Sequence, residues 1–291
     1  QVALSLVLLA GSGLLIRSLV RLNAVDAGFN PKELVTLQIP FPRSFYKNAG
    51  SNTATGGLLV EFDSRFTQLS ERVRERLASV PGVVSVTAGV TAPLKGQPRR
   101  VRFSRPGEPI DAQQSGALSA EWYPVSAGYA ETLNIPIERG RGIGPEDSET
   151  GRPVAVISAA MAHRYWGKAD PVGQRVQLDT LNDPPREIVG VVGDVRQDRY
   201  QISAQPQVYV PRVQLPHRMD MTVALEYLVT AYVVRTRSDV AALMPALRAA
   251  IREVGPALTV STAGTVEQYA ADQLQELNQY AVLLSLFGAI S

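Results

Sequence analysis

The chain has 291 residues, of which 45% are hydrophobic and 19% charged; these are ordinary values for a globular protein with about two domains. Its formal net charge of +2 provides no large field to steer nucleic acid or an acidic substrate toward it. The absence of cysteine excludes disulfides and thiolate chemistry.

Apolar segments stand at both ends of the sequence, at residues 2–20 and 281–291. The first is followed by basic side chains, Arg17 and Arg21, which can reach lipid headgroups from the end of a membrane helix. Each run is shorter than the roughly 20 residues that span a bilayer. We therefore expect two truncated transmembrane helices. A signal peptide, which needs basic residues before its apolar run, and a buried core helix are the alternatives.

A strand–helix–strand unit is predicted near the start of the part between these segments. Residues 35–39 alternate apolar and polar, as a half-buried strand does, and residues 40–57 have the composition of a long loop. From residue 59 to 77, apolar side chains recur every three or four positions, which predicts an amphipathic helix. A second strand is expected at residues 83–90.

A similar unit is predicted near the other end. Residues 227–236 indicate a strand, and Ser238 is a candidate N-cap for a helix with apolar residues on one face. Pro245 inside this helix predicts a kink or a later start. Residues 258–262 are expected to return as a strand.

The middle of the chain has a different pattern of predicted elements, with short strands, many turns and one short helix. We expect strands at residues 153–158, 173–179 and 186–195 and a helix at 159–166. The fold class is therefore α+β. Two pseudo-repeated units, residues 28–118 and 207–270, would form one subdomain, into which residues 119–206 are inserted.

The last helix is expected to leave the soluble part without a break. Thr265 and Gln268 have the spacing of a capping box, and no proline follows them. Residues 271–291 would then be an exit helix and the start of a second transmembrane helix, just as residues 1–22 would be the first. The alternative is a surface helix followed by an unrelated core segment.

The candidate chemical motifs do not describe an enzyme. Gly11 and Gly13 imitate the start of a dinucleotide fingerprint but lack its third glycine, and the glycine-rich residues 140–144 lack the lysine of a phosphate loop. His163 and His217 are far apart in sequence and have no ligand-spaced partner; His163 is expected on the polar side of its helix. We assign no catalytic, cofactor-binding or metal-binding residue.

Charged residues also gather in two places. The densest basic cluster contains Arg99, Arg100, Arg102 and Arg105. Its alternation with apolar residues favours the solvent-facing side of an edge strand, with an acidic partner or nucleic acid as the alternative. The acidic pair Glu146-Asp147 lies in a polar loop with no matching acid or base on which to build a reaction.

Five stretches of the sequence resemble a known family. They are residues 2–42, 80–94 (VPGVVSVTAGVTAPL), 125–143 (VSAGYAETLNIPIERGRGI), 154–178 and 188–198 (IVGVVGDVRQD). In this order they resemble the MacB-like periplasmic core domain of FtsX-type ABC transporter permeases, in particular the duplicated orphan permeases of acidobacteria. The resemblance implies a porter-like subdomain, residues 28–118 and 207–270, with an inserted, mainly-β sabre-like subdomain, residues 119–206.

The resemblance also implies a role. The domain would stand in the periplasm, between two helices of the inner membrane, and act in efflux or mechanotransmission. Its partners would be the lipid bilayer, a cytoplasmic ABC ATPase subunit, a second permease or permease half in a dimer, and a periplasmic adaptor, with no nucleic acid and no cofactor. The alternative is a membrane-anchored extracytoplasmic sensor or ligand-binding module without transport activity.

Overall fold

The computed structural model describes residues 27–51, 56–91, 93–94, 99–105, 118–180, 183–196, 203–269 and 271. Both apolar end segments, and with them the predicted transmembrane helices, lie outside these residues. Within the described part, no helix is both long and apolar enough to cross a membrane.

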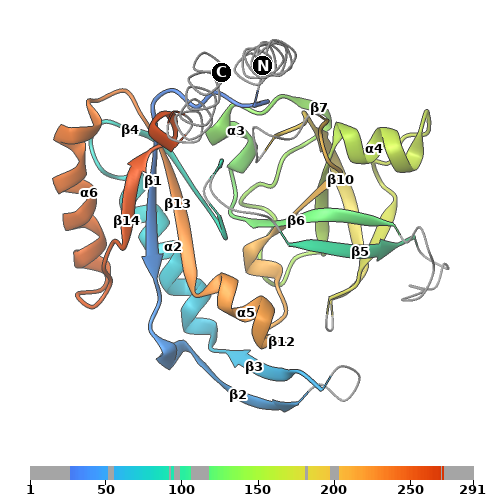
Figure 1. Ribbon diagram of the computed structural model, residues 1–291, viewed down its shortest axis with the longest axis horizontal. Coiled ribbons are helices and arrows are strands. Elements are labelled where there is room, and N and C mark those ends of the chain that lie inside the picture. Colours follow the sequence, from blue (N-terminus) through green and yellow to red (C-terminus); the bar gives the residue numbers. More distant parts are fainter. Residues whose placement is uncertain are drawn as a thin grey trace, which may run out of the picture.

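Four antiparallel strands form the first part of the fold, in the order β14–β1–β13–β4 (Figure 1). Their bounds are Thr262–Thr265, Leu34–Pro40, Val229–Thr236 and Val83–Gly89. Alternation along β1 sends Val35, Leu37 and Ile39 to one face of this sheet, whereas Leu34 packs on the other face. The sheet is therefore buried on both sides.

Two long helices cover the first of these faces. α2 (Ser64–Ala78) and α6 (Val240–Val254) each bury a stripe of apolar residues in the same core as β1, and Arg76 of α2 pairs with Glu253 of α6 at 2.7 Å. We call the four strands with α2 and α6 the sheet lobe. The lobe contains two units of strand, helix and strand: β1, α2 and β4, with β2 and β3 between β1 and α2, and β13, α6 and β14.

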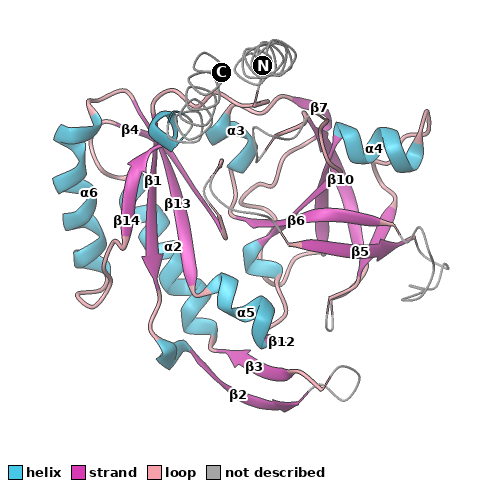
Figure 2. Ribbon diagram, in the orientation of Figure 1, coloured by secondary structure: helices cyan, strands magenta, loops and turns pink. Residues whose placement is uncertain are grey.

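The four strands of the sheet lobe belong to a larger sheet, whose remaining strands close into a barrel. Their pairings run in a ring, β11–β8–β10–β9–β5–β6 and back to β11, with β7 at the side of β10. The bounds are β5 Arg100–Ser104, β6 Ser119–Val125, β7 Ile137–Gly140, β8 Val154–Ser158, β9 Arg175–Leu178, β10 Arg186–Val192 and β11 Gln207–Pro211. With α4 (Ala159–Trp166), this ring is the barrel lobe (Figure 2); α3 (Tyr129–Leu133) follows β6 along the chain and packs against β4 and β13 of the sheet lobe.

The two lobes share little sheet pairing. β4 and β6 are joined at one residue pair in the described structure, Gly89 with Val125. A separate small sheet, β12–β3–β2, lies at the lower end in Figure 1, next to α5. Its strands are Arg218–Asp220, Leu58–Phe62 and Tyr46–Ser51, and α5 is Met221–Tyr227. We call it the hairpin sheet.

Several predicted elements agree with the structure. The strand at β8, the helix at α4 and the strand at β4 are confirmed, and the strands expected at residues 173–179 and 186–195 are β9 and β10, which pair antiparallel. The α+β class is also confirmed. The ring includes both β5 and β11, on either side of the predicted insertion, and the boundaries at residues 118 and 206 stay a prediction, as does the naming of porter-like and sabre-like parts.

Other predicted elements are wrong in detail. The loop predicted at residues 40–57 contains β2, and the helix predicted from residue 59 begins at Ser64, because residues 58–62 pair with β2 and β12. α6 runs through Pro245 and is capped by Asp239 rather than Ser238: the Asp239 carboxylate accepts the Ala242 N–H at 3.0 Å. The returning strand, β14, lies four residues later than expected because residues 262–265 pair with β1.

Candidate functional site

The segment that leads into β1 lies between the two lobes. In this lead-in segment, residues 27–33, the carbonyl of Ala27 accepts the N–H of Arg196, and Asn30 donates its N–H to the carbonyl of Leu133. On the sheet-lobe side, the carbonyl of Glu33 accepts the N–H of Thr236. Both lobes therefore hold the lead-in segment by main-chain hydrogen bonds.

Gly28 of the lead-in segment lies very close to the main chain of Asp194 in the barrel lobe. Its φ is +80°, and a Cβ placed on it would lie 1.8 Å from the carbonyl oxygen of Asp194. Only glycine fits this backbone conformation and this distance. Asp194 in turn accepts the N–H of Ala160 at 2.6 Å, at the start of α4. The lead-in segment is thus joined through one residue to a helix of the barrel lobe.

Arg235 connects the same segment to the sheet lobe. This β13 residue is 7% exposed, and its guanidinium donates to three carbonyl oxygens: Thr132 at 2.7 Å, Lys32 at 3.0 Å and Asn30 at 3.1 Å. Desolvation by burial lowers the pKa of Arg235, and the guanidinium nevertheless remains charged at neutral pH. One cation therefore connects β13, α3 and the lead-in segment.

The chain leaves the sheet lobe beside the place where it arrives. β14 pairs with β1, with Thr265 opposite Val35, and Val266 is fully buried in the same apolar cluster as Phe29 and Leu34. Thr265 and Gln268 make the reciprocal hydrogen bonds of a capping box, at 3.1 and 3.0 Å, which confirms the predicted helix start. We call the lead-in segment, Arg235 and residues 262–269 the base.

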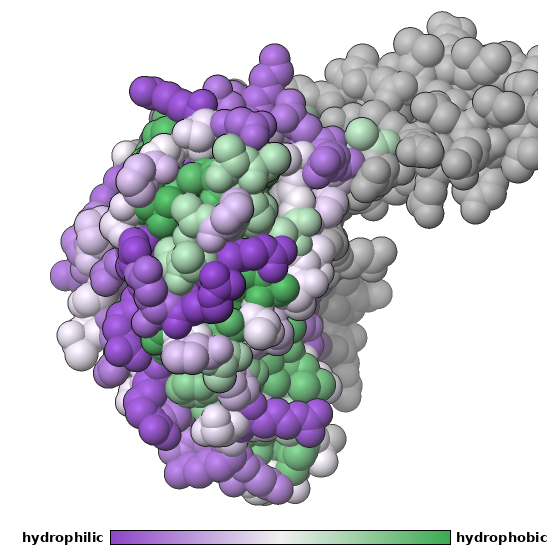
Figure 3. Space-filling model, turned by 90° about the vertical axis from the view of Figure 1, so that its left-hand side faces the viewer, coloured by the Kyte–Doolittle hydropathy of each residue, from purple (hydrophilic) through white to green (hydrophobic). Residues whose placement is uncertain are grey.

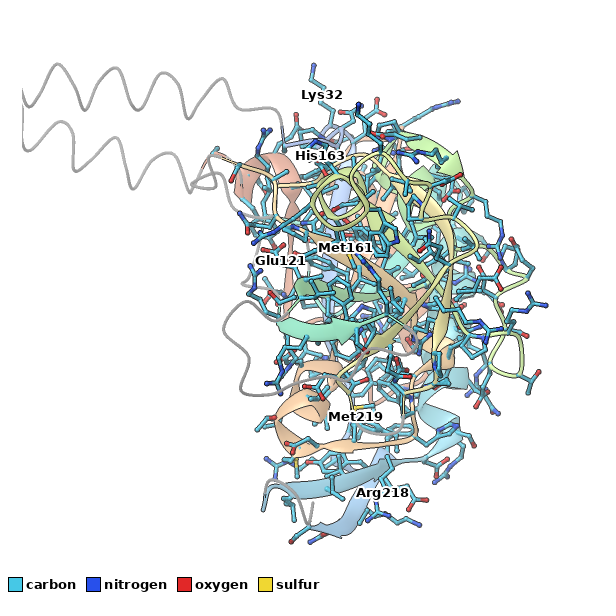
Figure 4. All side chains as sticks on the ribbon, turned by 90° about the vertical axis from the view of Figure 1, so that its right-hand side faces the viewer. Lys32, Glu121, Met161, His163, Arg218 and Met219 are labelled. Atoms are coloured by element: carbon cyan, nitrogen blue, oxygen red, sulfur yellow. The ribbon has the colours of Figure 1, made fainter. Side chains whose placement is uncertain are left out.

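The two histidines lie in different parts of the molecule. His163 is exposed on α4, on the polar side as predicted, and Figure 4 shows it toward the same end of the molecule as Lys32. His217 pairs with Glu149 at 2.9 Å, next to the hairpin sheet. Among the described residues, no group of three histidine or acidic side chains is arranged to hold a metal ion.

The basic cluster is solvated, but its strand is not an edge. β5 pairs with β6 on one side and β9 on the other, so the predicted edge strand is wrong. Arg99 pairs with Glu226 at 2.9 Å and Arg102 with Asp179 at 2.6 Å. The Arg105 guanidinium lies over the Trp166 ring and donates to the Tyr165 carbonyl. Partners within the chain occupy these three arginines.

The glycine-rich residues 140–144 form a loop that an ion pair closes. Arg141 donates two hydrogen bonds of 2.7 Å to Asp147, and Gly140 and Gly190 allow β7 and β10 to approach closely. Hydrogen bonding to Asp147 raises the pKa of Arg141. The Glu146-Asp147 pair therefore holds an arginine in place.

Sequence reasoning missed Arg235 and Gly28. The one signal for Arg235 was an arginine inside an otherwise apolar strand, YLVTAYVVRT. Gly28 stands just before Asn30 and Pro31, a composition typical of a turn, and its contact with Asp194 joins residues that are far apart in the sequence.

Comparison with known proteins identifies the family. The family model of the MacB-like periplasmic core domain matches residues 22–254. The chain therefore belongs to the MacB-like periplasmic core domain family, as its sequence resemblance implied.

Individual relatives are more distant. YknZ of Bacillus subtilis (strain 168), an uncharacterized ABC transporter permease, is 29% identical over 119 residues, which are 41% of this chain and 25% of YknZ. The chain thus spans about a quarter of the length of this curated relative.

Two solved structures are similar at low identity. The periplasmic region of MacB from Actinobacillus actinomycetemcomitans has a TM-score of 0.49 and 12% identity, with 87% of this chain and 97% of that chain covered. The extracellular domain of the noncanonic ABC-type transporter YknZ from Gram-positive bacteria has a TM-score of 0.43 and 16% identity, with 78% and 100% covered. Both scores lie below 0.5, so the family assignment rests on the family model.

Proposed function

We propose that the chain is the extracytoplasmic domain of an ABC-type permease of the bacterial inner membrane. In this proposal it couples ATP hydrolysis by a cytoplasmic ATPase subunit to conformational change in the periplasm and to substrate export. Its family membership and its likeness to a permease support the transport context. The observation that carries the coupling is the base, where the lead-in segment lies beside residues 262–269 and is held by both lobes.

The base can transmit movement for a physical reason. A shift of the lead-in segment relative to β14 strains the β1–β14 pairing, the three Arg235 hydrogen bonds and the Gly28–Asp194 contact together. These contacts cannot stretch far, because hydrogen bonds weaken steeply with distance and angle. The proposed response is a movement of the lobes relative to one another: one rung of sheet pairing joins them, and the apolar clusters that span both lobes can slide by small amounts, as packed elements do in shear motions.

The remaining parts of the proposal follow from the family. Residues 1–22 and 271–291 would contribute transmembrane helices, and the sheet and barrel lobes would correspond to the porter-like and sabre-like subdomains. The permease, or its halves, would pair as a dimer, and a periplasmic adaptor would complete an efflux assembly. Figure 3 shows that the face on the α6 side mixes hydrophilic and hydrophobic residues.

A membrane-anchored ligand-binding module is the second candidate. It is favoured by a surface hollow of about 470 Å³ beside the hairpin sheet, lined in part by Phe45, Tyr46 and Phe62. This volume is in the range of small-molecule sites. The hollow lies away from the base, at the end of the molecule that carries the hairpin sheet.

The test uses the full-length permease purified from inner membrane. We expect an ABC ATPase to co-purify with it. Spin labels on cysteines introduced at Gln68 of α2 and His163 of α4, both exposed, would report the distance between the lobes. The chain has no cysteine of its own, so labelling is specific within this domain.

A matched pair of labels at Gln68 and Arg248 lies within the sheet lobe and serves as the control. ATP should change the first distance and leave the second unchanged, and an ATPase without its catalytic glutamate should trap one state. If no ATPase co-purifies and the distance between the lobes is constant, the coupling proposal fails and the binding module takes its place.

A further inference from the structure

A narrow cleft opens between α2 and the connection from β11 to β12. Its volume is about 30 Å³, enough for about two water molecules. Arg212, Tyr227 and Ser70 line its inner part, and Phe62, Leu215 and Met219 are among the apolar residues that line it. In Figure 4, Met219 lies toward the end opposite Lys32, far from the base.

Arg212 is a buried cation with neutral partners. It is 7% exposed, and it donates to the carbonyl of Gly89 at 3.1 Å and to the Thr230 hydroxyl at 2.9 Å. Its guanidinium lies over the rings of Phe66 and Tyr227, at 5.9 and 5.8 Å from their centroids. Desolvation lowers the pKa of Arg212. A guanidinium has five N–H donors, so these two hydrogen bonds leave others for a ligand.

The acids around the cleft already have cations of their own. Among the described residues, Glu71 accepts from Arg74 at 2.7 Å, Glu61 pairs with Lys47 at 3.4 Å, and Glu149 pairs with His217 at 2.9 Å. Within this part of the structure, Arg212 is the cation on the wall of the cleft that pairs with no carboxylate. Burying such a charge is costly, and a bound anion would offset the cost.

Tyr227 provides a second polar group without a partner. It is 2% exposed, and its hydroxyl makes no hydrogen bond in the described structure. A buried hydroxyl normally has a partner, and its absence requires an explanation. An anion next to Arg212 could accept this O–H. Ser70, by contrast, is already hydrogen-bonded to Tyr232 at 3.0 Å.

We propose that the Arg212–Tyr227 cleft binds an organic carboxylate, whose body lies in the adjoining hollow. Two carboxylate oxygens need about the room of two waters, whereas a tetrahedral phosphate is wider and carries more charge. The hollow of about 470 Å³ shares Phe62 and His217 with the cleft, and Phe45 and Tyr46 add aromatic surface. An aromatic body attached to the carboxylate can pack on the three aromatic rings, whereas the rest of the wall is polar: Ser44, Lys47, Glu61, Asp63, Ser64 and His217.

The site goes beyond the proposed transport function and does not depend on it. It assigns a ligand class to a place where the sheet lobe, the barrel lobe and the hairpin sheet meet. Gly89 and Thr230 belong to the sheet lobe, and Arg212 directly follows β11 of the barrel lobe.

The test uses the whole 291-residue chain in detergent, with phenylacetate as the probe. Trp122 reports binding, because its ring centroid is 5.9 Å from that of Tyr227; a Trp166→Phe background removes the other tryptophan. We expect phenylacetate to change Trp122 fluorescence saturably at millimolar concentrations or below. Phenylacetamide, without charge, and phenyl phosphate, with a tetrahedral dianion, should bind at least tenfold more weakly.

Substitutions then locate the site. Arg212→Met should weaken phenylacetate binding at least tenfold, and Tyr227→Phe about threefold or more. Tyr227→Phe is the safer variant: its lost hydroxyl has no partner, so Tm should change by no more than about 2 °C. Arg175→Met removes an equal charge from an exposed position of β9 that does not line the cleft, and should bind as the parent chain does.

Three results would overturn the proposal. The first is that phenylacetate shows no saturable binding up to about 20 mM, roughly the weakest affinity that the assay could resolve. The second is that phenylacetamide or phenyl phosphate binds as tightly as phenylacetate. The third is that Arg212→Met or Tyr227→Phe leaves phenylacetate binding unchanged. If Arg212→Met does not fold, the Tyr227→Phe result decides alone.

Discussion

Arg235 and Thr132, which are far apart in the sequence, are joined by a 2.7 Å hydrogen bond from the Arg235 Nε to the Thr132 carbonyl oxygen. The bond joins β13 of the sheet lobe to α3, the helix that follows β6 of the barrel lobe, and two further bonds from Arg235 reach the lead-in segment. A side chain that connects three segments should affect both stability and coupling.

Arg235→Met should lower the free energy of unfolding by about 1–3 kcal/mol, because it leaves the buried Thr132 carbonyl without its donor. Arg235→Lys keeps the charge but not the planar set of N–H donors. Its free energy of unfolding should lie between those of the parent chain and Arg235→Met. Urea denaturation measures the stability. In the full-length permease, Arg235→Met should also reduce the ATP-dependent change in the Gln68–His163 distance. A full response at reduced stability would show that Arg235 is structural only.

Gly28→Ala should destabilise the chain by more than about 3 kcal/mol, since left-handed backbone strain and a clash with the Asp194 carbonyl act together. Gly128→Ala is the matched control. Its φ is +74°, close to that of Gly28, but a Cβ there would meet no atom within 4 Å. The control should cost about 1–2 kcal/mol. Thermal and urea denaturation compare the two, and equal losses would contradict the close contact at Asp194.

Thr265→Ala should cost about 1 kcal/mol by removing the cap of the exit helix, whereas Thr265→Ser should cost much less. Gln268→Ala removes the reciprocal bond to the Thr265 N–H. A double-mutant cycle on denaturation midpoints should give a coupling energy of about 0.5–1 kcal/mol. Strictly additive losses would mean that the two bonds form independently.

Asp63 should titrate below its ordinary value of 3.8, because hydrogen bonds from the Arg65 side chain and backbone lower the pKa of its carboxyl. A depressed folded-state pKa stabilises the fold above the ordinary value, and this stabilisation is lost as pH falls through the folded pKa. NMR titration of the Asp63 carboxyl carbon measures it. Arg65→Gln should return the pKa toward 3.8, and an unchanged pKa would remove Arg65 as the cause.

The elements that could be predicted from the sequence are those with one clear period or boundary. Residues 154–166 pass from an apolar strand to an amphipathic helix at Ser158, and the Ser158 hydroxyl caps the helix by accepting the Met161 N–H at 3.2 Å. Thr265 and Gln268 were predictable for the same reason: the interaction is local.

The missed elements depend on partners that are distant in sequence. Leu59 and Phe62 fit the spacing of the helix that follows, and only pairing with β2 and β12 makes them a strand. Arg102 alternates with apolar residues as an edge position would, yet β9 covers that side of β5. Arg235, Gly28 and the Arg212–Tyr227 cleft likewise arise from tertiary packing, which periodicity does not encode.

The single rung between β4 and β6, Gly89 with Val125, has a mechanical consequence. Pulling on the lead-in segment loads β1 along its length against β13 and β14, and many hydrogen bonds share that shear. Between the lobes, by contrast, the sheet contributes one rung, and the other links are the apolar clusters that both lobes share and the side-chain hydrogen bonds of Arg212 and Arg235. Under load, the boundary between the lobes should therefore open before the strands within either lobe separate.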